Sequence, residues 1–234
     1  MELTSSPTPS QVQALFNRIA PVYDPLNDWL SLGLHRVWKQ MAVKWSQVQP
    51  GQSALDVCCG SGDLALLLAR RVGIQGQVVG LDFSTAQLEM AKIRSRGLGQ
   101  IKWIQGDALG LPFDDGSFDG ATLGYGLRNV SDIPQCLSEL YRVLRPGGWV
   151  AILDFSHPQE LWLKNFQAWY LQQIVVPLAK TYNLTDEYTY LIPSLARYPK
   201  PPELITMAQA AGFQAVTFYP LMGGLMGVLV GQHP

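Results

Sequence analysis

Between Gln52 and Phe155, short apolar segments alternate with segments whose apolar residues recur at helical spacing. Short apolar segments bounded by turn residues are typical of buried strands. Strands that alternate with helices form a parallel sheet through right-handed crossovers, with helices on both faces. Ligands of such sheets bind at the carboxyl ends of the strands. The strands are expected at 53–58, 77–82, 101–105, 118–124 and 149–155, and the helices at 63–72, 84–96 and 132–144.

The segments on either side of this alternating core are expected to complete one domain over residues 1–234. Apolar residues at helical spacing predict a helical lid in 1–48, before the core of 51–155. Residues 157–202 are rich in Trp, Tyr, Leu and Pro, and their length favours a helical cap over a plain loop. A helix and two strands are expected to close the chain within 203–234.

The composition excludes several classes of protein. The formal net charge is -1 and 15% of the residues are charged, so the basic excess of a nucleic-acid-binding protein is missing. The longest apolar run is shorter than the roughly 20 residues that span a bilayer, and the N-terminus lacks the pattern of a signal peptide. The cysteines have no paired spacing, so neither a disulfide framework nor a metal site is indicated. We therefore expect a cytoplasmic protein that binds small or apolar molecules.

A glycine-rich turn directly follows the first expected strand, in the stretch ALDVCCGSGD of residues 54–63. Gly60, Ser61 and Gly62 form this turn, since glycine lets the backbone bend tightly and approach a ligand closely. Asp82 ends the second strand about 20 residues further on, where a carboxylate accepts hydrogen bonds from ribose hydroxyls. The spacing predicts a cofactor that contains a nucleoside.

Two carboxylates flank the turn and indicate the charge of that cofactor. Asp56 precedes the turn, and Asp63 follows it at the start of the next helix. A pyrophosphate is attracted to a bare helix N-terminus and repelled by a carboxylate at that position. S-adenosylmethionine carries an ammonium and a sulfonium group, which carboxylates attract. The two acids therefore favour S-adenosylmethionine over a dinucleotide, although Asp63 can also serve only as a helix cap.

The remaining cofactor contacts are expected beside the other strand ends. Asp107 follows the third strand, where it can meet the adenine amino group, and Ala108 lies beside it. No metal ligand is predicted. The predicted cofactor-binding residues are Asp56, Gly60, Ser61, Gly62, Asp82, Phe83, Asp107 and Ala108.

The core resembles a known fold. Its glycine turn, acid-ended strands and Pro-Gly-Gly turn resemble class I S-adenosylmethionine-dependent methyltransferases over residues 51–155. This resemblance implies a Rossmann-like α/β fold with a seven-stranded, mostly parallel sheet, to which the closing strands supply an antiparallel member. The helical lid and the helical cap are additions to that fold.

Three stretches carry a more specific resemblance. YDPLNDWLSLGLHRVW at 23–38 resembles a signature of the ubiquinone/menaquinone biosynthesis C-methyltransferases, with Leu26 in place of methionine. RVLRPGGWVAILDFS at 142–156 resembles their second signature, with Arg145 in place of lysine and Asp154 in place of glutamate. The third stretch is TLGYGLRNV. Together these stretches extend the resemblance over nearly the whole chain.

Within this family, DVCCGSGD, GLDFS, TLGYGLRNV and ILDF resemble the plant and cyanobacterial branch. The branch implies C-methylation of 2-phytyl-1,4-naphthoquinol (demethylphylloquinol) to phylloquinol, the last step of phylloquinone (vitamin K1) biosynthesis. A menaquinone or ubiquinone precursor is the alternative substrate within the family. An NAD-dependent oxidoreductase and a non-catalytic cofactor-binding scaffold are further alternatives, but no Tyr-x-x-x-Lys pattern follows the fourth strand.

The implied reaction needs a reduced ring. Methyl transfer to a ring carbon requires the electron-rich quinol, which loses a phenolic proton to a base or a water relay. A positive group then stabilises the developing naphtholate. Arg128 is expected to supply that charge, and Tyr23 and Asn129 are expected to position the relay water. The alternative for Arg128 is a structural ion pair with Asp24 or Asp154.

Aromatic residues are expected to form the substrate pocket, lined by Tyr125, Tyr188 and Tyr190. The phytyl tail of the substrate requires an apolar surface. Segment 157–202 can form a groove for this tail, rest on a membrane surface or simply pack as a cap. Peripheral membrane contact is therefore a hypothesis beside the expected cytoplasmic location.

Overall fold

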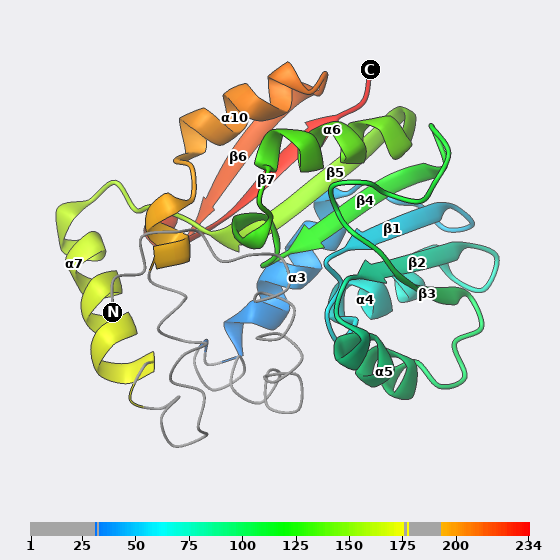
Figure 1. Cartoon of the computed structure of the whole chain (residues 1–234), viewed down its shortest axis with the longest axis horizontal. Helices are drawn as coiled ribbons and strands as arrows, with labels where there is room; N and C mark the ends of the chain where they lie inside the picture. Colours follow the sequence, from blue (N-terminus) through cyan, green and yellow to red (C-terminus); the bar gives the residue numbers. More distant parts are fainter. Residues whose placement is uncertain (1–30, 32, 176, 178–192) are drawn as a thin grey trace.

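The computed structural model describes residues 31, 33–175, 177 and 193–234, and seven strands of this part form one sheet (Figure 1). The strands are β1 (Ser53–Val57), β2 (Gln77–Asp82), β3 (Ile101–Gln105), β4 (Phe118–Gly124), β5 (Leu144–Phe155), β6 (Gln214–Leu221) and β7 (Met226–Gln232). Their order in the sheet is β3-β2-β1-β4-β5-β7-β6. Neighbours from β3 to β5 are parallel, whereas β7 is antiparallel to both β5 and β6. The predicted fold class is confirmed, including its antiparallel member.

The fifth strand begins earlier than the sequence predicts. Helix α6 (Ile133–Val143) leads directly into β5, whose first residue, Leu144, pairs with Phe118. The register then shifts before Trp149, and the Pro-Gly-Gly segment bulges from the strand with Gly147 at a φ of 84°. The expected turn is therefore a bulge inside one long strand.

Helices cover both faces of the sheet, as the alternation of segments predicts (Figure 1). Besides α6, they are α3 (Leu34–Trp45), α4 (Asp63–Val72), α5 (Thr85–Arg94) and α10 (Pro201–Ala210). Trp38 of α3 and Leu68 of α4 lie in one apolar cluster with residues of β1 and β7. Leu137 of α6 and Leu204 of α10 lie in a second cluster with other residues of β1 and β7. The sheet thus separates two cores.

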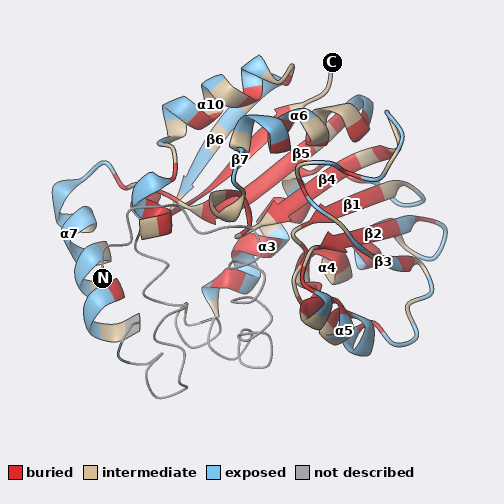
Figure 2. Cartoon of the chain, viewed as in Figure 1, coloured by how far each residue is buried: buried red, intermediate tan, exposed pale blue. Residues whose placement is uncertain are grey.

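The centre of the sheet is buried, whereas β6 is an exposed edge strand without a buried residue (Figure 2). Asp56 in β1 and Asp82 at the end of β2 are buried despite their carboxyl groups. Buried carboxylates require hydrogen-bond partners. The carboxyl ends of these two strands are therefore built around polar groups.

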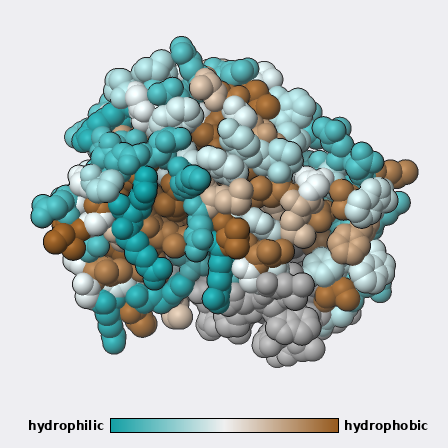
Figure 3. Space-filling model, turned by 180° about the vertical axis from the view of Figure 1, so that it is seen from behind, coloured by the Kyte–Doolittle hydropathy of each residue, from teal (hydrophilic) through white to brown (hydrophobic). Residues whose placement is uncertain are grey.

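The segment after β5 is helical in the part that the structure describes. Helix α7 (Leu161–Tyr170) continues into a π-helical turn at Leu171–Val175, and residues 193–197 are also helical. No residue of α7 is buried. Among the described residues, no helix is long and apolar enough to cross a membrane. Seen from behind, the molecule shows hydrophobic side chains scattered among hydrophilic ones (Figure 3).

Some predictions concern residues outside the described part. These residues include the first helical pattern of the expected lid and Tyr23, Asp24, Tyr188 and Tyr190. The second half of that lid is helical, because α3 forms where its pattern predicts. The division of the chain into lid, core, cap and closing segment stays a prediction.

Candidate cofactor and substrate site

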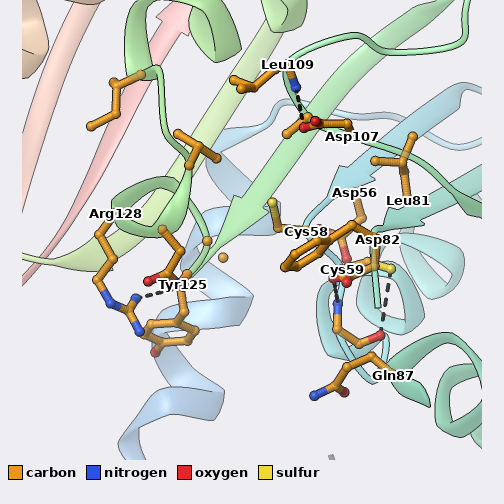
Figure 4. Close-up of a pocket in the computed structure, with 18 of the residues that line it drawn as sticks. Asp56, Cys58, Cys59, Leu81, Asp82, Gln87, Asp107, Leu109, Tyr125 and Arg128 are labelled. Carbon is orange, nitrogen blue, oxygen red and sulfur yellow. Dashed lines mark hydrogen bonds between the residues drawn. The ribbon is translucent and has the colours of Figure 1, made fainter. Parts of the chain in front are cut away.

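A cavity of about 470 Å³ lies at the carboxyl ends of β1, β2 and β4 (Figure 4). Its walls come from the glycine turn, the loops after β2, β3 and β4, and parts of α3 and α10. Of the predicted cofactor-binding residues, the cavity is lined by Asp56, Gly60, Ser61, Asp82, Phe83, Asp107 and Ala108. Of the predicted catalytic and pocket residues, it is lined by Tyr125, Arg128 and Asn129.

Asp82 holds the glycine turn against the end of β2. Its Oδ2 accepts a hydrogen bond of 2.8 Å from the backbone N–H of Gly60, and its Oδ1 accepts one of 2.9 Å from that of Ser84. The side chain is only 5% exposed, and this burial raises the pKa of its carboxyl group. Each carboxylate oxygen has a second lone pair, so Asp82 can fix the turn and still accept a hydrogen bond from a ligand.

Asp56 connects β1 with α4 and β4. Its Oδ2 accepts a hydrogen bond of 2.9 Å from the backbone N–H of Ala65, and its Oδ1 accepts one of 2.8 Å from the Thr122 hydroxyl. Burial raises the pKa of Asp56 to about 7, although these two hydrogen bonds act in the opposite direction. Near neutral pH the group is therefore close to its titration midpoint. A cation in the cavity would favour its ionised form.

Asp63 does not present an uncompensated negative charge, in contrast to the electrostatic reasoning from sequence. It forms ion pairs with Lys39 and with Arg94, the latter at 2.5 Å. Burial opposes ionisation, but the two cations hold the pKa of Asp63 below its usual value. The attraction of a cationic cofactor therefore depends on Asp56 and Asp82 more than on Asp63.

Lys39 is a cavity-lining residue that the sequence analysis missed. Its side chain is buried, and its Nζ lies 5.6 Å from the ring centroid of Tyr125 besides contacting Asp63. A signal was available, because Lys39 lies four residues after His35 and four before Val43 on the buried face of α3. A lysine on the buried face of a helix requires a partner, and here that partner is the acid of the glycine turn.

Gly62 is part of the turn but does not line the cavity. It adopts a φ of 92°, and a Cβ atom there would lie 2.5 Å from the Trp103 ring. Ser61 is held by Arg94, whose Nη1 donates hydrogen bonds of 3.0 Å to its carbonyl and 2.7 Å to its hydroxyl oxygen. Gly62 therefore shapes the turn, whereas Ser61 is fixed at the cavity wall.

The part of the cavity beside the loops after β2 and β3 has mainly apolar walls. Phe83 is half-buried, Ala108 is buried, and Asp107 is exposed. The Oδ1 of Asp107 accepts a hydrogen bond of 3.0 Å from the backbone N–H of Leu109, which closes a tight turn after β3. This arrangement suits a flat, weakly polar ring held between Phe83 and the loop after β3.

Arg128 forms the ion pair with Asp154 that the sequence offered as an alternative. Its Nη1 lies 2.5 Å from Asp154 Oδ1 and donates a hydrogen bond of 2.7 Å to the Tyr125 carbonyl. Its guanidinium also lies 5.0 Å from the Phe155 ring centroid. In Figure 4, Arg128 and Tyr125 lie across the cavity from Asp82. The ion pair fixes a positive group at the wall opposite the residues that are predicted to bind the cofactor.

Asn129 follows Arg128 in a short 3-10 helix, η1 (Leu127–Asn129). Its Nδ2 donates a hydrogen bond of 3.2 Å to the Tyr125 carbonyl. Its Oδ1 is buried and has no hydrogen-bond partner within the described part of the chain. Tyr125 adopts a φ of 60°, which is rare for a residue other than glycine and marks a constrained turn. A buried acceptor is thus held beside Arg128.

A second, mainly apolar part of the cavity was not predicted from sequence. Its lining residues come from the loop after η1, the start of α6, the segment before α10 and α10 itself: Val130, Ile133, Pro134, Tyr198 and Met207. Tyr198 is buried, and its carbonyl is hydrogen-bonded to His157 Nε2 at 2.8 Å. Val130 ends the stretch TLGYGLRNV, whereas the other four belong to none of the three stretches that carry the family resemblance, and the fold brings them to the cavity.

Residues 4–233 match the profile described as the ubiE/COQ5 methyltransferase family. A Thermosynechococcus vestitus protein named 2-phytyl-1,4-naphthoquinone methyltransferase is 60% identical over 223 residues, covering 95% of this chain and 99% of that protein. An Arabidopsis thaliana protein named chloroplastic 2-phytyl-1,4-β-naphthoquinone methyltransferase is 52% identical over 224 residues, covering 94% and 86% respectively. The likeness therefore extends over nearly the whole length of each chain.

Solved structures with the same fold are more distant in sequence. The cyclase SpnF aligns with a TM-score of 0.72 at 18% identity, covering 98% of both chains. An S-adenosylmethionine-dependent methyltransferase of Aquifex aeolicus aligns with a TM-score of 0.59 at 18% identity, covering 84% of this chain and 89% of that one. At such identities the likeness concerns the fold alone, and the fold does not determine the reaction.

Proposed function

Because this chain belongs to the ubiE/COQ5 methyltransferase family, we propose that it transfers a methyl group from S-adenosylmethionine to a ring carbon of 2-phytyl-1,4-naphthoquinol. The family confirms the predictions of a methyltransferase and of S-adenosylmethionine as its cofactor. The substrate is proposed from the names of relatives that are 60% and 52% identical to this chain. The products are then phylloquinol and S-adenosylhomocysteine.

The cavity residues fit this cofactor. A volume of about 470 Å³ lies within the range of roughly 300–1,000 Å³ that is typical of small-molecule sites. Asp82 offers acceptors for the ribose, and Phe83 and Ala108 offer apolar contact for the adenine. When bound, S-adenosylmethionine supplies an electrophilic methyl group. Asp56 and Asp82 favour its net positive charge, whereas the pyrophosphate gives a dinucleotide a net negative charge.

The observation that carries the proposal is the juxtaposition of these acids with Arg128, Asn129 and an apolar lobe in one cavity. The quinol ring carbon gains the methyl group and loses its hydrogen as a proton. Asn129 Oδ1 accepts a hydrogen bond from the phenolic hydroxyl or from a water that removes its proton. The Arg128 guanidinium, oriented by Asp154, stabilises the naphtholate oxygen. The role of Tyr23 in this relay stays a proposal from the resemblance.

Methyl transfer tests the proposal directly. Labelled S-adenosylmethionine is mixed with the reduced naphthoquinol, with the oxidised naphthoquinone and with a benzoquinol precursor of ubiquinone. Label is expected in the reduced naphthoquinol alone, because only that ring is both electron-rich and matched to the site. Label in the benzoquinol instead would agree with the family but would contradict the proposed naphthoquinol substrate. Label in none of the three would contradict the proposed reaction.

We also propose that α7 contacts the membrane that holds this lipid substrate. Leu161, Trp162, Phe166 and Trp169 are exposed by 70%, 66%, 44% and 52%, and the last three follow one face of the helix. Trp residues favour the interface of a bilayer, and exposed apolar residues gain by entering it. A phytyl quinol partitions into the same layer.

Sedimentation with liposomes tests this contact. The double variant Trp162→Ser/Trp169→Ser is expected to release the protein from liposomes that contain the quinone. The control is Ile74→Ser, because Ile74 is an 86% exposed apolar residue between α4 and β2. Equal sedimentation of all three proteins would remove α7 as the contact surface.

A further inference from the structure

Gln87 is a buried polar residue of the cavity that the proposed reaction does not use. It lies in the first turn of α5, where its backbone N–H donates a hydrogen bond of 3.2 Å to the hydroxyl of the capping residue Ser84. The residue is 1% exposed and lines the cavity. Its Oε1 is buried without a hydrogen-bond partner among the residues that the structure describes. A buried acceptor left unpaired destabilises a fold, so a role in binding is indicated.

The carboxamide of Gln87 lies at the glycine turn. Its Oε1 is 3.8 Å from the position that a Cβ atom on Gly60 would occupy. The backbone N–H of Gly60 is hydrogen-bonded to Asp82, and Figure 4 shows Gln87 beside this turn. Two acceptors, one neutral and one charged, therefore lie next to the same glycine of the cavity wall. Such a pair suits a ligand group that carries several hydrogen-bond donors.

We propose that Gln87 is a further cofactor-binding residue, whose Oε1 accepts a hydrogen bond from a hydroxyl or ammonium group of S-adenosylmethionine. The inference rests on the family's cofactor and on no property of the quinol. Binding completes the hydrogen bonding of the Gln87 Oε1, which has no partner within the described part of the chain. Gln87 thus adds affinity without adding charge.

Isothermal titration of the full chain with S-adenosylhomocysteine tests this role. Gln87→Met, which keeps the length of the side chain but has no oxygen, is expected to raise the dissociation constant about tenfold. Gln87→Glu keeps an acceptor and is expected to stay within about threefold of the parent. The control is Gln209→Met, because Gln209 is exposed on α10 and does not line the cavity. Unchanged affinity in Gln87→Met would overturn the proposal.

A second ligand identifies the donor. 5′-Methylthioadenosine keeps the ribose and the adenine but lacks the ammonium group. If a ribose hydroxyl is the donor, Gln87→Met weakens binding of both ligands. If the ammonium is the donor, the variant weakens binding of S-adenosylhomocysteine alone. Both outcomes support the proposal. Neither binding measurement uses the quinol, so the result is independent of whether methyl transfer is observed.

Thermal unfolding separates binding from a purely structural role. Removing an unpaired buried acceptor is expected to leave the ligand-free midpoint of Gln87→Met equal to or above that of the parent. The rise in midpoint on adding S-adenosylhomocysteine is expected to shrink. A lower ligand-free midpoint with an undiminished rise would mean that Gln87 only supports the fold, and would overturn the proposal.

Discussion

Asp82 and Arg128 lie on opposite sides of the cavity, and their variants should affect different steps. Asp82→Ala removes the acceptor proposed for the ribose and is expected to weaken S-adenosylhomocysteine binding at least tenfold. Arg128→Ala is expected to leave that binding within about twofold and to lower turnover about a hundredfold, since the naphtholate loses its stabilising charge. Titration calorimetry and the methyl-transfer assay measure the two effects. Parent-like affinity in Asp82→Ala would refute the ribose assignment.

The Arg128 variant needs a control for stability. Arg128→Ala leaves Asp154 buried without its cation, which costs about 3–5 kcal/mol of folding free energy. The double variant Arg128→Gln/Asp154→Asn removes both charges together. It should recover most of this stability but none of the turnover. Recovery of turnover would show that Arg128 serves only the fold.

The raised pKa of the Asp56 carboxyl group predicts how the stability of the chain depends on pH. Burial raises its pKa to about 7, whereas the ordinary value is 3.8. An acid with a raised pKa contributes its full stability below the unfolded-state value and loses that contribution as the pH rises through the folded-state value. The free energy of unfolding of the parent should therefore fall, relative to Asp56→Asn, from about pH 4 to pH 7. Denaturant titrations at several pH values measure the difference, and a constant difference would contradict the raised pKa.

At the scale of elements, α3 and α4 can be compared, because each helix begins directly after a glycine with a positive φ. Gly62 and Gly33 precede α4 and α3, with φ values of 92° and 77°. A Cβ atom on Gly62 would collide with Trp103, whereas one on Gly33 would meet no atom of the described residues within 4 Å. Gly33→Ala should cost about 1 kcal/mol of backbone strain, and Gly62→Ala should cost at least about 2 kcal/mol more. If urea unfolding shows the same loss of unfolding free energy in both variants, the Trp103 side chain moves aside to accommodate the new Cβ atom.

The same elements explain which parts of the structure the sequence could predict. The strands and helices of the core follow from apolar periodicity, because β1, β2 and β4 are mostly buried and each core helix has one buried face. The start of β5 does not, since a bulge lets a Pro-Gly-Gly segment stay inside a strand that pairs on both sides of it. Local turn propensity favours a break there, and the long-range pairing of Leu144 with Phe118 overrides it.

The candidate site shows the same division between local and long-range information. The predicted cofactor-binding residues lie in motifs at strand ends, so their positions follow from the parallel sheet. Lys39 and Arg94 are far from Asp63 in the sequence, and only the packing of α3 and α5 against the turn makes them its partners. Tyr198 and Met207 likewise reach the cavity through the fold. Motifs therefore reveal the residues at the strand ends, but they do not reveal the residues that reach the turn or the cavity from distant parts of the chain.

At the scale of the whole molecule, one sheet connects all walls of the cavity, so ligand binding should stabilise the chain as one unit. A ligand at a hundredfold excess over its dissociation constant adds about 2.7 kcal/mol of stability, which shifts the unfolding midpoint of a chain of this size by about 5–10 °C. S-adenosylhomocysteine is expected to move a single calorimetric transition by this amount, and Asp82→Ala, with a dissociation constant raised at least tenfold, should lower the shift by about half or more. Two transitions, of which the ligand shifts only one, would instead show that the chain contains separately folding parts. In that case α10 and the closing strands would unfold independently of the residues predicted to bind the cofactor.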